Sequence, residues 1–531
     1  KFLVKSGINF GETFSANPKY IKQITLIAFL WLLLTNAGDL GVLDTQLRLQ
    51  MANAWWTGKE EVQITPNMNR KIRGDIRFGV IGANEKRYIA YEQGQSLLML
   101  PGDWIGTQLS KVFPILEEEE WRELMVSFLI FIPINIAVVV SGYWLLNLFD
   151  FPDKVAAISS LLLLLATTVL HHAQVHQQNN QILALIIVGY AGVLGFIKTQ
   201  KYPLLFWSGL ALGGTILIRI TCILHVFTVG CFLLECLLYQ TKNIQKIIKD
   251  ISIWLVGLVP FTFLGRLFDI IRYGSFFASG KRVEKLQLAT DPMWEGLPQL
   301  DPNYPLVNSP HVGILGPFIS PAKSIFLYDP LVLPCLVAGI AYWRRFHPYL
   351  QWYLITIGLN FSLHLVAYSR FFFWHGDHAW AARYHVTSLH LFLLPLIAVL
   401  IKEIPSLSNL KKNLVKAAIT IALIVQLASV AMPLNLEIFQ EVNAFPGSQY
   451  QLRLLKRVIN IACYVNPSIT KYCIPNYPEK EKLVSQWNRF NFFPFVLQEK
   501  ISNLWLNRLI FVLWFLILVS SIIVTYRFLI G

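Results

Sequence analysis

The sequence predicts an all-α membrane protein with about twelve transmembrane helices. Of its 531 residues, 55% are hydrophobic and 14% are charged, whereas soluble domains carry about 25% charged residues. Apolar runs long enough to cross a bilayer recur from one end of the chain to the other, more of them than one globular core needs. The basic residues between these runs divide unequally between the two sides of the membrane.

The predicted spans follow one another with short turns, except at three places. We expect them at about 22–36, 124–148, 154–170, 181–197, 203–218, 221–239, 251–268, 328–343, 351–368, 386–401, 415–433 and 508–527. The long segments 37–123, 269–327 and 434–507 all fall on one side. They are too long for turns and too rich in aromatic residues for disordered tails. We interpret residues 1–531 as one integral membrane domain with an ordered extracytoplasmic layer.

The basic residues set the orientation. With the N-terminus in the cytoplasm, the inner side holds Lys1, Lys5, Lys19, Lys22, Lys154, Lys198, Lys201, Lys242, Lys246, Lys249, Arg344, Arg345, Lys402, Lys411, Lys412, Lys416 and Arg527. The short outer turns hold only Arg219, Arg370 and Arg383. This bias is typical of a multi-pass protein of the plasma (inner) membrane with both termini cytoplasmic. Because the net charge of +14 is confined mostly to these short segments, nucleic acid is not an expected partner, whereas membrane lipids are.

The last outer segment carries two further predictions. Apolar and basic residues alternate at helical spacing over Gln451–Ile461, which predicts a short helix lying on the membrane. Cys463 and Cys473 lie ten residues apart on the outer side, where an oxidising compartment favours a disulfide. The alternative is two free thiols.

Two carboxylates stand where the first span leaves the bilayer. Asp39 and Asp44 follow it directly, and Arg48 comes one helical turn after Asp44. An acid at the surface of an otherwise apolar chain is a candidate catalytic or binding group. The plainer interpretation is a pair of solvated loop residues.

Cations occur in two other outer segments. Arg272 and Lys281 open the segment 269–327, and a later turn contains Asp377, His378, Arg383 and Tyr384. Arginine and lysine hold phosphate, and a carboxylate accepts a proton from an attacking hydroxyl. Together these groups suit the transfer of a group from a lipid phosphate to an alcohol. The alternative for each arginine is anchoring to lipid headgroups.

No cofactor is expected. A divalent metal held by Asp44, Asp377 and His378 is conceivable, but the histidines have no recognised metal-ligand spacing. The chain also has no phosphate-binding glycine-rich loop in a plausible strand–helix setting. Nucleotide-driven transport and a nucleotide-sugar donor are therefore disfavoured.

Six segments in order resemble the GT-C membrane glycosyltransferases, specifically the bacterial dolichyl-phosphate-mannose/aminoarabinose-transferase-like group. They are DTQLRLQMANAWWTG (Asp44–Gly58), YEQGQSLLMLP (Tyr91–Pro101), GLALGGTILIRITCILHV (Gly209–Val226), RYGSFFASGKR (Arg272–Arg282), GILGPFISPAKSIFLYDP (Gly313–Pro330) and WHGDHAWAARYHVTSLHLFLLPL (Trp374–Leu396). The chain departs from the best-known members at Thr45, where a second acid is common, and at Asp377 and His378, where Gly-Trp is common. These departures leave the role of a second acid and the acceptor open.

The resemblance implies a GT-C fold and an inverting transfer on the outer face. The donor would be a polyprenyl-phosphate sugar, giving hexosyl or pentosyl transfer to a glycan, lipid or protein acceptor. Asp44 would be the catalytic base, with Asp39 as the second candidate. Arg48, Asp377, His378 and Tyr384 would bind substrate, and Arg272, Lys281 or Arg383 would stabilise the departing phosphate.

Two other classes remain open. One is a lipid or solute transporter or flippase, whose acids and arginines would line a translocation path. Transporters commonly show repeats with broken helices at mid-membrane, and the two halves of this chain show no internal repeat. The other is a non-catalytic subunit of a membrane complex, which would leave the six ordered segments unexplained.

The predicted topology can be tested with reporter fusions placed after Lys249 and after Lys412. Both should report a cytoplasmic location, because both points lie in segments that the basic residues assign to the inner side. An extracytoplasmic signal at either point would overturn the topology.

Overall fold

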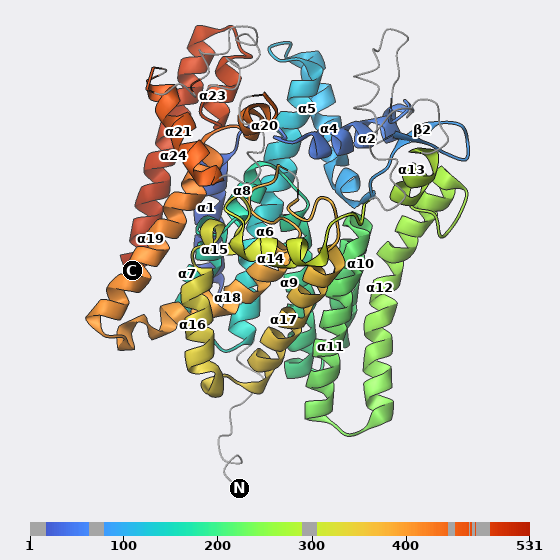
Figure 1. Cartoon of the computed structure of the whole chain (residues 1–531), viewed down its shortest axis with the longest axis vertical. Coiled ribbons are helices and arrows are strands. Elements are labelled where there is room, and N and C mark those ends of the chain that lie inside the picture. Colours follow the sequence, from blue (N-terminus) through green and yellow to red (C-terminus); the bar gives the residue numbers. More distant parts are fainter. Residues whose placement is uncertain are drawn as a thin grey trace.

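The structure is a computed structural model, and it describes residues 17–62, 79–288, 305–376, 378–443, 452–466, 468–469, 473 and 489–530. The regular secondary structure of these residues is almost entirely helical (Figure 1). Within them, the strands are limited to one hairpin of β1 (Gly79–Ile81) and β2 (Arg87–Ile89), which pair antiparallel with Gly79 opposite Ile89. The chain is therefore an all-α protein, as predicted.

Eight helical segments in the described part are long and apolar enough to cross a membrane. They are α5 (Glu118–Val126) continuing through η1 (Ser127–Phe131) into α6 (Ile132–Leu148), α9 (Asn179–Thr199), η2 (Ile220–Cys222) with α11 (Ile223–Gln240), α12 (Ile244–Tyr273), α17 (Pro348–Tyr368), α18 (Val386–Glu403) with η6 (Ile404–Ser406), α19 (Asn409–Ala431) and α24 (Leu504–Ile530). The chain is thus a multi-pass membrane protein.

The other four predicted spans are also helices, but they are shorter or less apolar. They are α1 (Pro18–Thr35), α7 (Asp153–Leu165), α10 (Tyr202–Ile218) and α16 (Val332–Tyr342). All twelve predicted segments are therefore helical, and eight meet the length and hydropathy of a full span. Helices α9 and α18 are the most buried of these eight and lie at the centre of the main hydrophobic core.

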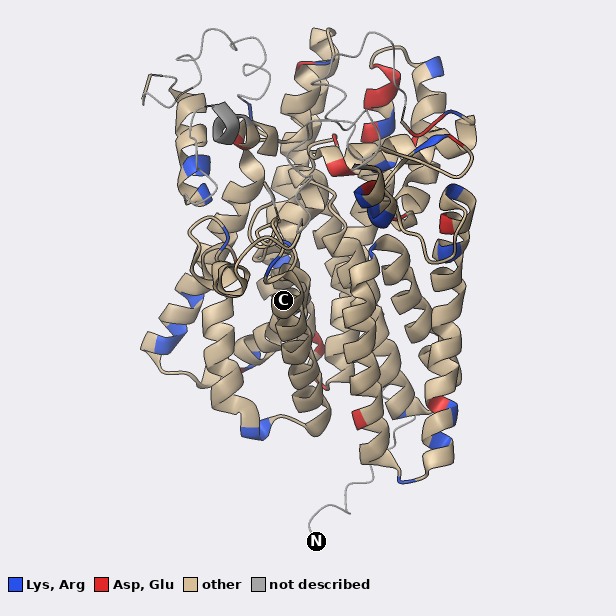
Figure 2. Cartoon of the chain, turned by 45° about the vertical axis from the view of Figure 1, so that its right-hand side comes forward, with Lys and Arg blue, Asp and Glu red and all other residues tan. Residues whose placement is uncertain are grey.

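The helices alternate in direction, which separates two ends of the molecule (Figure 1). Helices α1 and α24 run antiparallel, since Trp31 Nε1 donates to Thr525 Oγ1 at 3.0 Å and Trp514 Nε1 donates to the carbonyl of Leu34 at 3.0 Å. The start of α1 and the end of α24 therefore lie at one end. Lysines and arginines gather at the turns there (Figure 2), and we call it the basic end. Its assignment to the cytoplasm stays a prediction.

The opposite end, the loop end, carries the described parts of the three long segments, and the turn between α7 and α9 with its helix α8 (Val169–Gln174). The helices of the long segments are α2 (Leu43–Thr57), α4 (Gly94–Val112), α13 (Gly280–Leu288), α14 (Pro310–Ile319), α15 (Ile325–Tyr328), α20 (Leu434–Asn443), α21 (Arg453–Val465) and α23 (Phe493–Gln498). The predicted disulfide between Cys463 and Cys473 is confirmed, with a Cα–Cα distance of 5.3 Å.

Helix α21 confirms the predicted helix around Gln451–Ile461, with its polar face turned inward. Arg453 and Arg457 are buried, whereas Leu455 and Val465 are 55% and 76% exposed. An apolar face that points away from the protein suits a helix lying in the membrane interface. Contact of α21 with lipid stays a prediction.

Close backbone packing sets the positions of two arginines at the loop end. Helices α10 and α12 meet at Gly209 and Gly257, where a Cβ on Gly209 would lie 2.1 Å from the carbonyl oxygen of Trp254. Arg219 follows the end of α10, and Arg272 lies in the last turn of α12. This contact therefore fixes where both arginines leave the helix pair.

Candidate functional site

Asp44 lies in the first turn of α2, where the helix dipole favours a carboxylate. Its Oδ1 accepts a hydrogen bond of 2.8 Å from the hydroxyl of Tyr91. Its side chain is 29% exposed. The carboxylate is thus fixed at one oxygen and still open to solvent.

Three cations surround this carboxylate and its tyrosine partner. Arg383 Nη1 lies 3.4 Å from Asp44 Oδ2. The Arg48 guanidinium lies 4.1 Å from the centre of the Tyr91 ring, and Lys281 Nζ lies 5.0 Å from it. Residues from three separate outer segments therefore meet around Tyr91.

Arg48 lies one helical turn after Asp44 on α2, as predicted, and contacts its backbone. Arg48 Nη1 donates to the backbone carbonyl of Asp44 at 2.9 Å. Its guanidinium lies over the ring of Tyr91 instead of against the Asp44 carboxylate, a cation–π arrangement. Arg48 therefore braces the first turn of α2 and also contributes positive charge to the site.

These charges keep Asp44 ionised. Burial raises the pKa of the Asp44 carboxyl, but Arg383, Arg48, the Tyr91 hydrogen bond and Lys281 together outweigh burial, so the pKa lies below its usual value. The pKa of the Tyr91 hydroxyl is well above its usual value, because of burial and then the Asp44 charge. Tyr91 therefore remains the proton donor in their hydrogen bond.

Arg383 is held on several sides. Its carbonyl accepts from Asn179 Nδ2 at 2.7 Å, and its Nη2 donates to the Tyr384 hydroxyl at 3.3 Å. The Tyr384 ring stacks on that of Tyr368, with the centroids 4.4 Å apart. The Nε of Arg383 is buried without an acceptor among the described residues, although the side chain as a whole is 19% exposed. Arg383 thus keeps part of its side chain accessible, and its buried Nε–H has no acceptor among the described residues.

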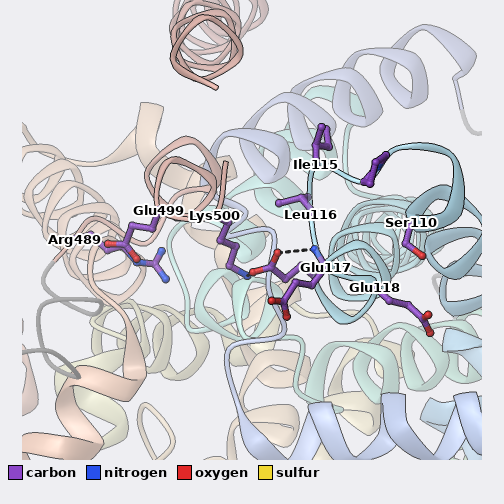
Figure 3. A pocket seen from close by; sticks show the side chains of 10 residues that line it. Ser110, Ile115, Leu116, Glu117, Glu118, Arg489, Glu499 and Lys500 are labelled. Atoms are coloured by element: carbon purple, nitrogen blue, oxygen red, sulfur yellow. Dashed lines mark hydrogen bonds and ion pairs between the residues drawn. The ribbon is translucent and has the colours of Figure 1, made fainter. Parts of the chain in front are cut away.

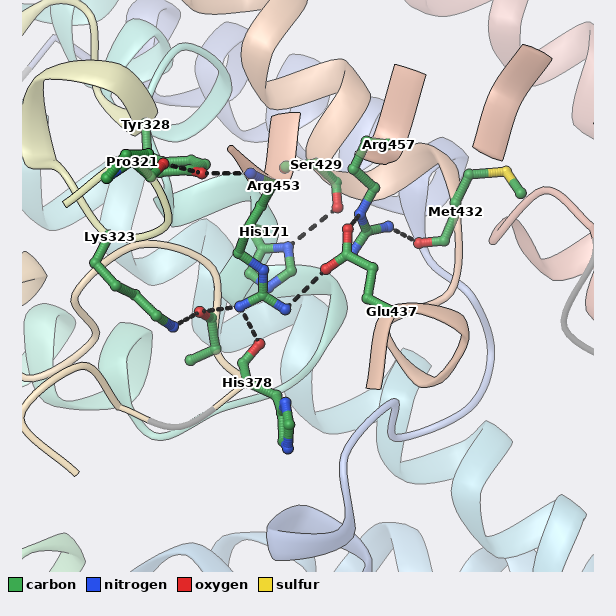
Figure 4. A network of polar contacts seen from close by, with 11 residues as sticks. His171, Pro321, Lys323, Tyr328, His378, Ser429, Met432, Glu437, Arg453 and Arg457 are labelled. Atoms are coloured by element: carbon green, nitrogen blue, oxygen red, sulfur yellow. Dashed lines mark hydrogen bonds and ion pairs between the residues drawn. The ribbon is translucent and has the colours of Figure 1, made fainter. Parts of the chain in front are cut away.

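The turn that carries Arg383 is anchored to the outer helices (Figure 4). Arg453 Nη1 donates to the carbonyls of His378 and Ala379 at 2.6 and 2.7 Å. Lys323 Nζ donates to the same Ala379 carbonyl at 2.5 Å. Arg453 also pairs with Glu437 at 2.8 Å, so the turn is tied through one buried arginine to α20 and α21.

The remaining predicted residues have other surroundings. His378 contributes its carbonyl to the Arg453 contact. Asp377 lies outside the described residues. Asp39 lies next to Leu40, whose N–H donates to Glu123 Oε2 at 3.4 Å. Asp39 therefore lies on the side of Glu123, and among the described residues it forms no ion pair with an arginine.

Arg272 occupies a different place from the one predicted. It is 2% exposed, pairs with Glu61 at 2.5 Å, and donates to the carbonyls of Ile89 and Tyr91 at 2.6 and 3.2 Å. The guanidinium of Arg272 is therefore bound by groups of the protein itself. Arg272 therefore holds the backbone of Tyr91, and the hydroxyl of Tyr91 in turn contacts Asp44.

Sequence reasoning missed three residues near this site. Tyr91 opens the segment Tyr91–Pro101, but no spacing in the sequence identifies it as a partner of Asp44. Arg219 pairs with Gln178 Oε1 at 3.1 and 3.2 Å, and the sequence indicates only that it lies in an outer turn. Burial, followed by the charges of Arg383 and Arg219, lowers the pKa of His172 to about 3. His172 is therefore a neutral buried side chain beside the two arginines.

Two other findings concern ligands. Among the described residues, no group of three or more histidine, cysteine or acidic side chains is arranged to hold a metal, and Asp377 of the conceivable metal set lies outside them. A cavity of about 1080 Å³ opens at the loop end beside Glu117, Arg489 and Lys500 (Figure 3). Neither Asp44 nor Arg383 lines it.

Comparison with known proteins gives structural similarity alone. No protein-family model and no curated protein sequence matches the chain. The solved structure of ArnT from Cupriavidus metallidurans bound to undecaprenyl phosphate is similar at 13% identity and a TM-score of 0.44, over 84% of this chain and 69% of that one.

Two archaeal structures are similar to the same degree. The apo oligosaccharyltransferase of Archaeoglobus fulgidus has 12% identity and a TM-score of 0.44, over 82% of this chain and 59% of that one. AglB from Archaeoglobus fulgidus, in complex with an inhibitory peptide and a dolichol-phosphate, has 11% identity and a TM-score of 0.45, over 88% of this chain and 60% of that one.

The chain spans 59% to 69% of the length of these three structures. All three belong to the GT-C membrane glycosyltransferases, the class that the sequence segments resemble. With TM-scores below 0.5, the likeness is one of general architecture. The function proposed below therefore rests on the site itself.

The assignment of Arg272 predicts the outcome of a stability comparison. Arg272→Gln should lower the free energy of unfolding by about 3–5 kcal/mol, because it leaves the buried Glu61 carboxylate without its cation. The matched control is Lys281→Gln, which removes a 51% exposed partner of Glu284 and should change stability by about 0–1 kcal/mol. Unfolding of the purified protein in detergent measures both. Similar small losses for the two variants would contradict a structural role for Arg272.

Proposed function

We propose that this protein is a glycosyltransferase that moves a sugar from a polyprenyl-phosphate carrier to an acceptor hydroxyl, with inversion at the anomeric carbon. The supporting observation is the Asp44–Arg383 pair, an ionised, accessible carboxylate with a guanidinium 3.4 Å away. The pair lies at the loop end of a membrane-spanning bundle, where a lipid-linked phosphate and a water-soluble acceptor can both arrive.

The two charged groups suit the two halves of the transfer. Asp44 Oδ2, the oxygen that does not accept from Tyr91, takes the proton of the acceptor hydroxyl. The hydroxyl oxygen bonds to the anomeric carbon from the face opposite the phosphate, and the bond between that carbon and the phosphate oxygen breaks. The electron pair leaves with the phosphate, which is stable as an anion and needs no general acid. Asp44 then releases its proton to solvent.

Arg383 provides the complementary contact to the leaving phosphate. A guanidinium forms two parallel hydrogen bonds with phosphate oxygens, and its Nε–H lacks an acceptor among the described residues. Hydrogen-bond donors aimed at developing negative charge stabilise the transition state. Arg48 and Lys281 add positive charge around Tyr91 without occupying the Asp44 carboxylate.

The same pair couples donor binding to base strength. In the free protein Arg383 lowers the pKa of Asp44, which makes the carboxylate a weak base. A bound phosphate would share the charge of Arg383 and so reduce its pull on Asp44. The pKa of Asp44 would then rise when the donor is in place, and the base would be strongest with the donor bound.

The finer parts of the proposal concern location and substrates. We place the loop end outside the plasma (inner) membrane and both termini in the cytoplasm, following the distribution of basic residues. The transferred group is a hexose or pentose, and the acceptor is a glycan, a lipid or a protein.

Asp44→Asn should abolish most of the transfer. The amide keeps the size of the carboxylate but does not accept the proton, and loss of a general base typically costs about 100- to 10,000-fold in rate. The assay follows sugar release from a polyprenyl-phosphate sugar in proteoliposomes. Asp39→Asn is the matched control, five residues away and apart from the arginines, and should lose much less. If Asp39→Asn is inactive and Asp44→Asn is active, Asp39 is the base. If both variants are active, the proposal is wrong.

The pH dependence of kcat/KM tests the pairing of Arg383 with Asp44. Transfer needs ionised Asp44, so the rate falls as the pH falls through its pKa. In the native protein this acid limb should lie below about pH 4, because the pKa of Asp44 is below the usual value of 3.8. Arg383→Gln removes the largest lowering influence while burial remains, so the limb should move to higher pH.

Two further variants complete this test. Arg370→Gln removes an exposed arginine of the same outer turn and should leave the acid limb in place. Arg383→Lys keeps the charge but loses the two-point fork, so it should impair the rate while shifting the limb little. If the acid limb of Arg383→Gln lies at the same pH as that of the native protein, Arg383 does not lower the pKa of the base.

A further inference from the structure

A groove lies at the basic end of the molecule, away from Asp44. It has a volume of about 620 Å³ and lies between α16, α17 and α18, within the range of about 300–1,000 Å³ typical of ligand sites. Leu336, Leu354 and Leu396 give it an apolar wall from all three helices. Arg344 and Arg345 line the same groove where α16 ends.

The lengths of two helices place the groove in one half of the bilayer. Helix α17 begins at Pro348, three residues after Arg345, and its 21 residues cover about 31 Å, the thickness of a hydrocarbon core. Helix α16 has 11 residues and covers about 16 Å from the same level. The groove beside α16 therefore lies in the leaflet at the basic end. The outward face of α16 is apolar, with Ile340 79% exposed.

The charge of this groove is not balanced by the protein. Arg344 and Arg345 are both exposed, and neither forms an ion pair with any part of the chain that the structure describes. Arg345 lies over the Tyr342 ring, 5.2 Å from its centre, which leaves its hydrogen-bond donors available. Two neighbouring guanidinium groups at the end of an apolar groove match a phosphate attached to an acyl chain.

We propose that this groove binds one anionic phospholipid from the leaflet at the basic end. One acyl chain lies between α16, α17 and α18, and the phosphate lies against Arg344 and Arg345. The net negative charge of the lipid selects it over phosphatidylcholine, because a basic residue at an anionic membrane surface contributes on the order of 1 kcal/mol, or about fivefold in binding. The site does not depend on the transfer reaction proposed above.

Trp343 supplies a local probe, because it lines the same groove. The protein is reconstituted in phosphatidylcholine nanodiscs that contain a small fraction of phospholipid brominated on its acyl chains, which quenches nearby tryptophan. Subtracting the signal of Trp343→Phe isolates Trp343 from the other tryptophans. We expect brominated phosphatidylglycerol to quench Trp343 at a much lower fraction than brominated phosphatidylcholine does.

Charge variants then test whether the arginines select the lipid. Arg344→Gln with Arg345→Gln should reduce the preference for phosphatidylglycerol by about fivefold for each arginine removed. The matched control is Lys411→Gln with Lys416→Gln, which removes two exposed charges at the start of α19 at the same end. It should leave the preference unchanged.

Two outcomes would overturn the proposal. Equal quenching of Trp343 by the two lipids in the native protein would mean that the groove holds any annular lipid. An equal loss of preference in the arginine and lysine pairs would mean that the charge of the whole surface attracts the lipid, without a site. Correct folding of each variant is checked by its unchanged elution as a single species in detergent.

Discussion

The contact between Asp44 and Arg383 joins segments that lie 339 residues apart in the sequence, and the chemistry proposed for the loop end depends on it. Asp44 belongs to the first outer segment and Arg383 to the turn between α17 and α18. The helices deliver these segments to the same end, but helix packing alone does not set a side-chain contact. Each partner needs its own support, and the structure gives each a buried ion pair.

The two supporting ion pairs work in the same way. On one side, Glu61 and Arg272 hold the backbone around Tyr91, whose hydroxyl fixes Asp44. On the other, Glu437 and Arg453 hold the turn that leads to Arg383. Burying a charge is costly unless it is paired and hydrogen-bonded, and these residues are paired.

The central pair differs from its supports. Its contact of 3.4 Å is longer than the supporting contacts of 2.5 and 2.8 Å, and both side chains keep exposed surface. The two groups of the central pair share one long contact, whereas Arg272 and Arg453 each make several short ones. The strong interactions therefore stabilise the surroundings of the pair, and the accessible pair itself is held weakly. A ligand that competes for Arg383 then meets a small energetic barrier, which is the behaviour expected of a preorganised site.

Sequence patterns predicted the helices well, because a membrane demands long apolar runs and an asymmetric charge distribution. They also predicted the disulfide. They failed where charged groups turn inward. The periodicity of α21 revealed an amphipathic helix but not which face the protein covers, and Arg453 is buried while Leu455 is exposed. The burial of Arg272 depends on Glu61, an acid 211 residues away, and no local pattern carries that information.

The two candidate acids show most clearly that local sequence does not reveal the surroundings of a charged side chain. Asp39 and Asp44 are five residues apart, have the same side chain and leave the same helix, so local sequence ranks them only by position. The fold separates them, because Asp39 lies on the side of Glu123 and Asp44 lies among Arg383, Arg48 and Lys281. Three of the groups that lower the pKa of Asp44, namely Tyr91, Lys281 and Arg383, come from elsewhere in the chain. The chemistry of Asp44 is therefore a property of the assembled loop end, and its own helix α2 supplies only the carboxylate and the brace of Arg48.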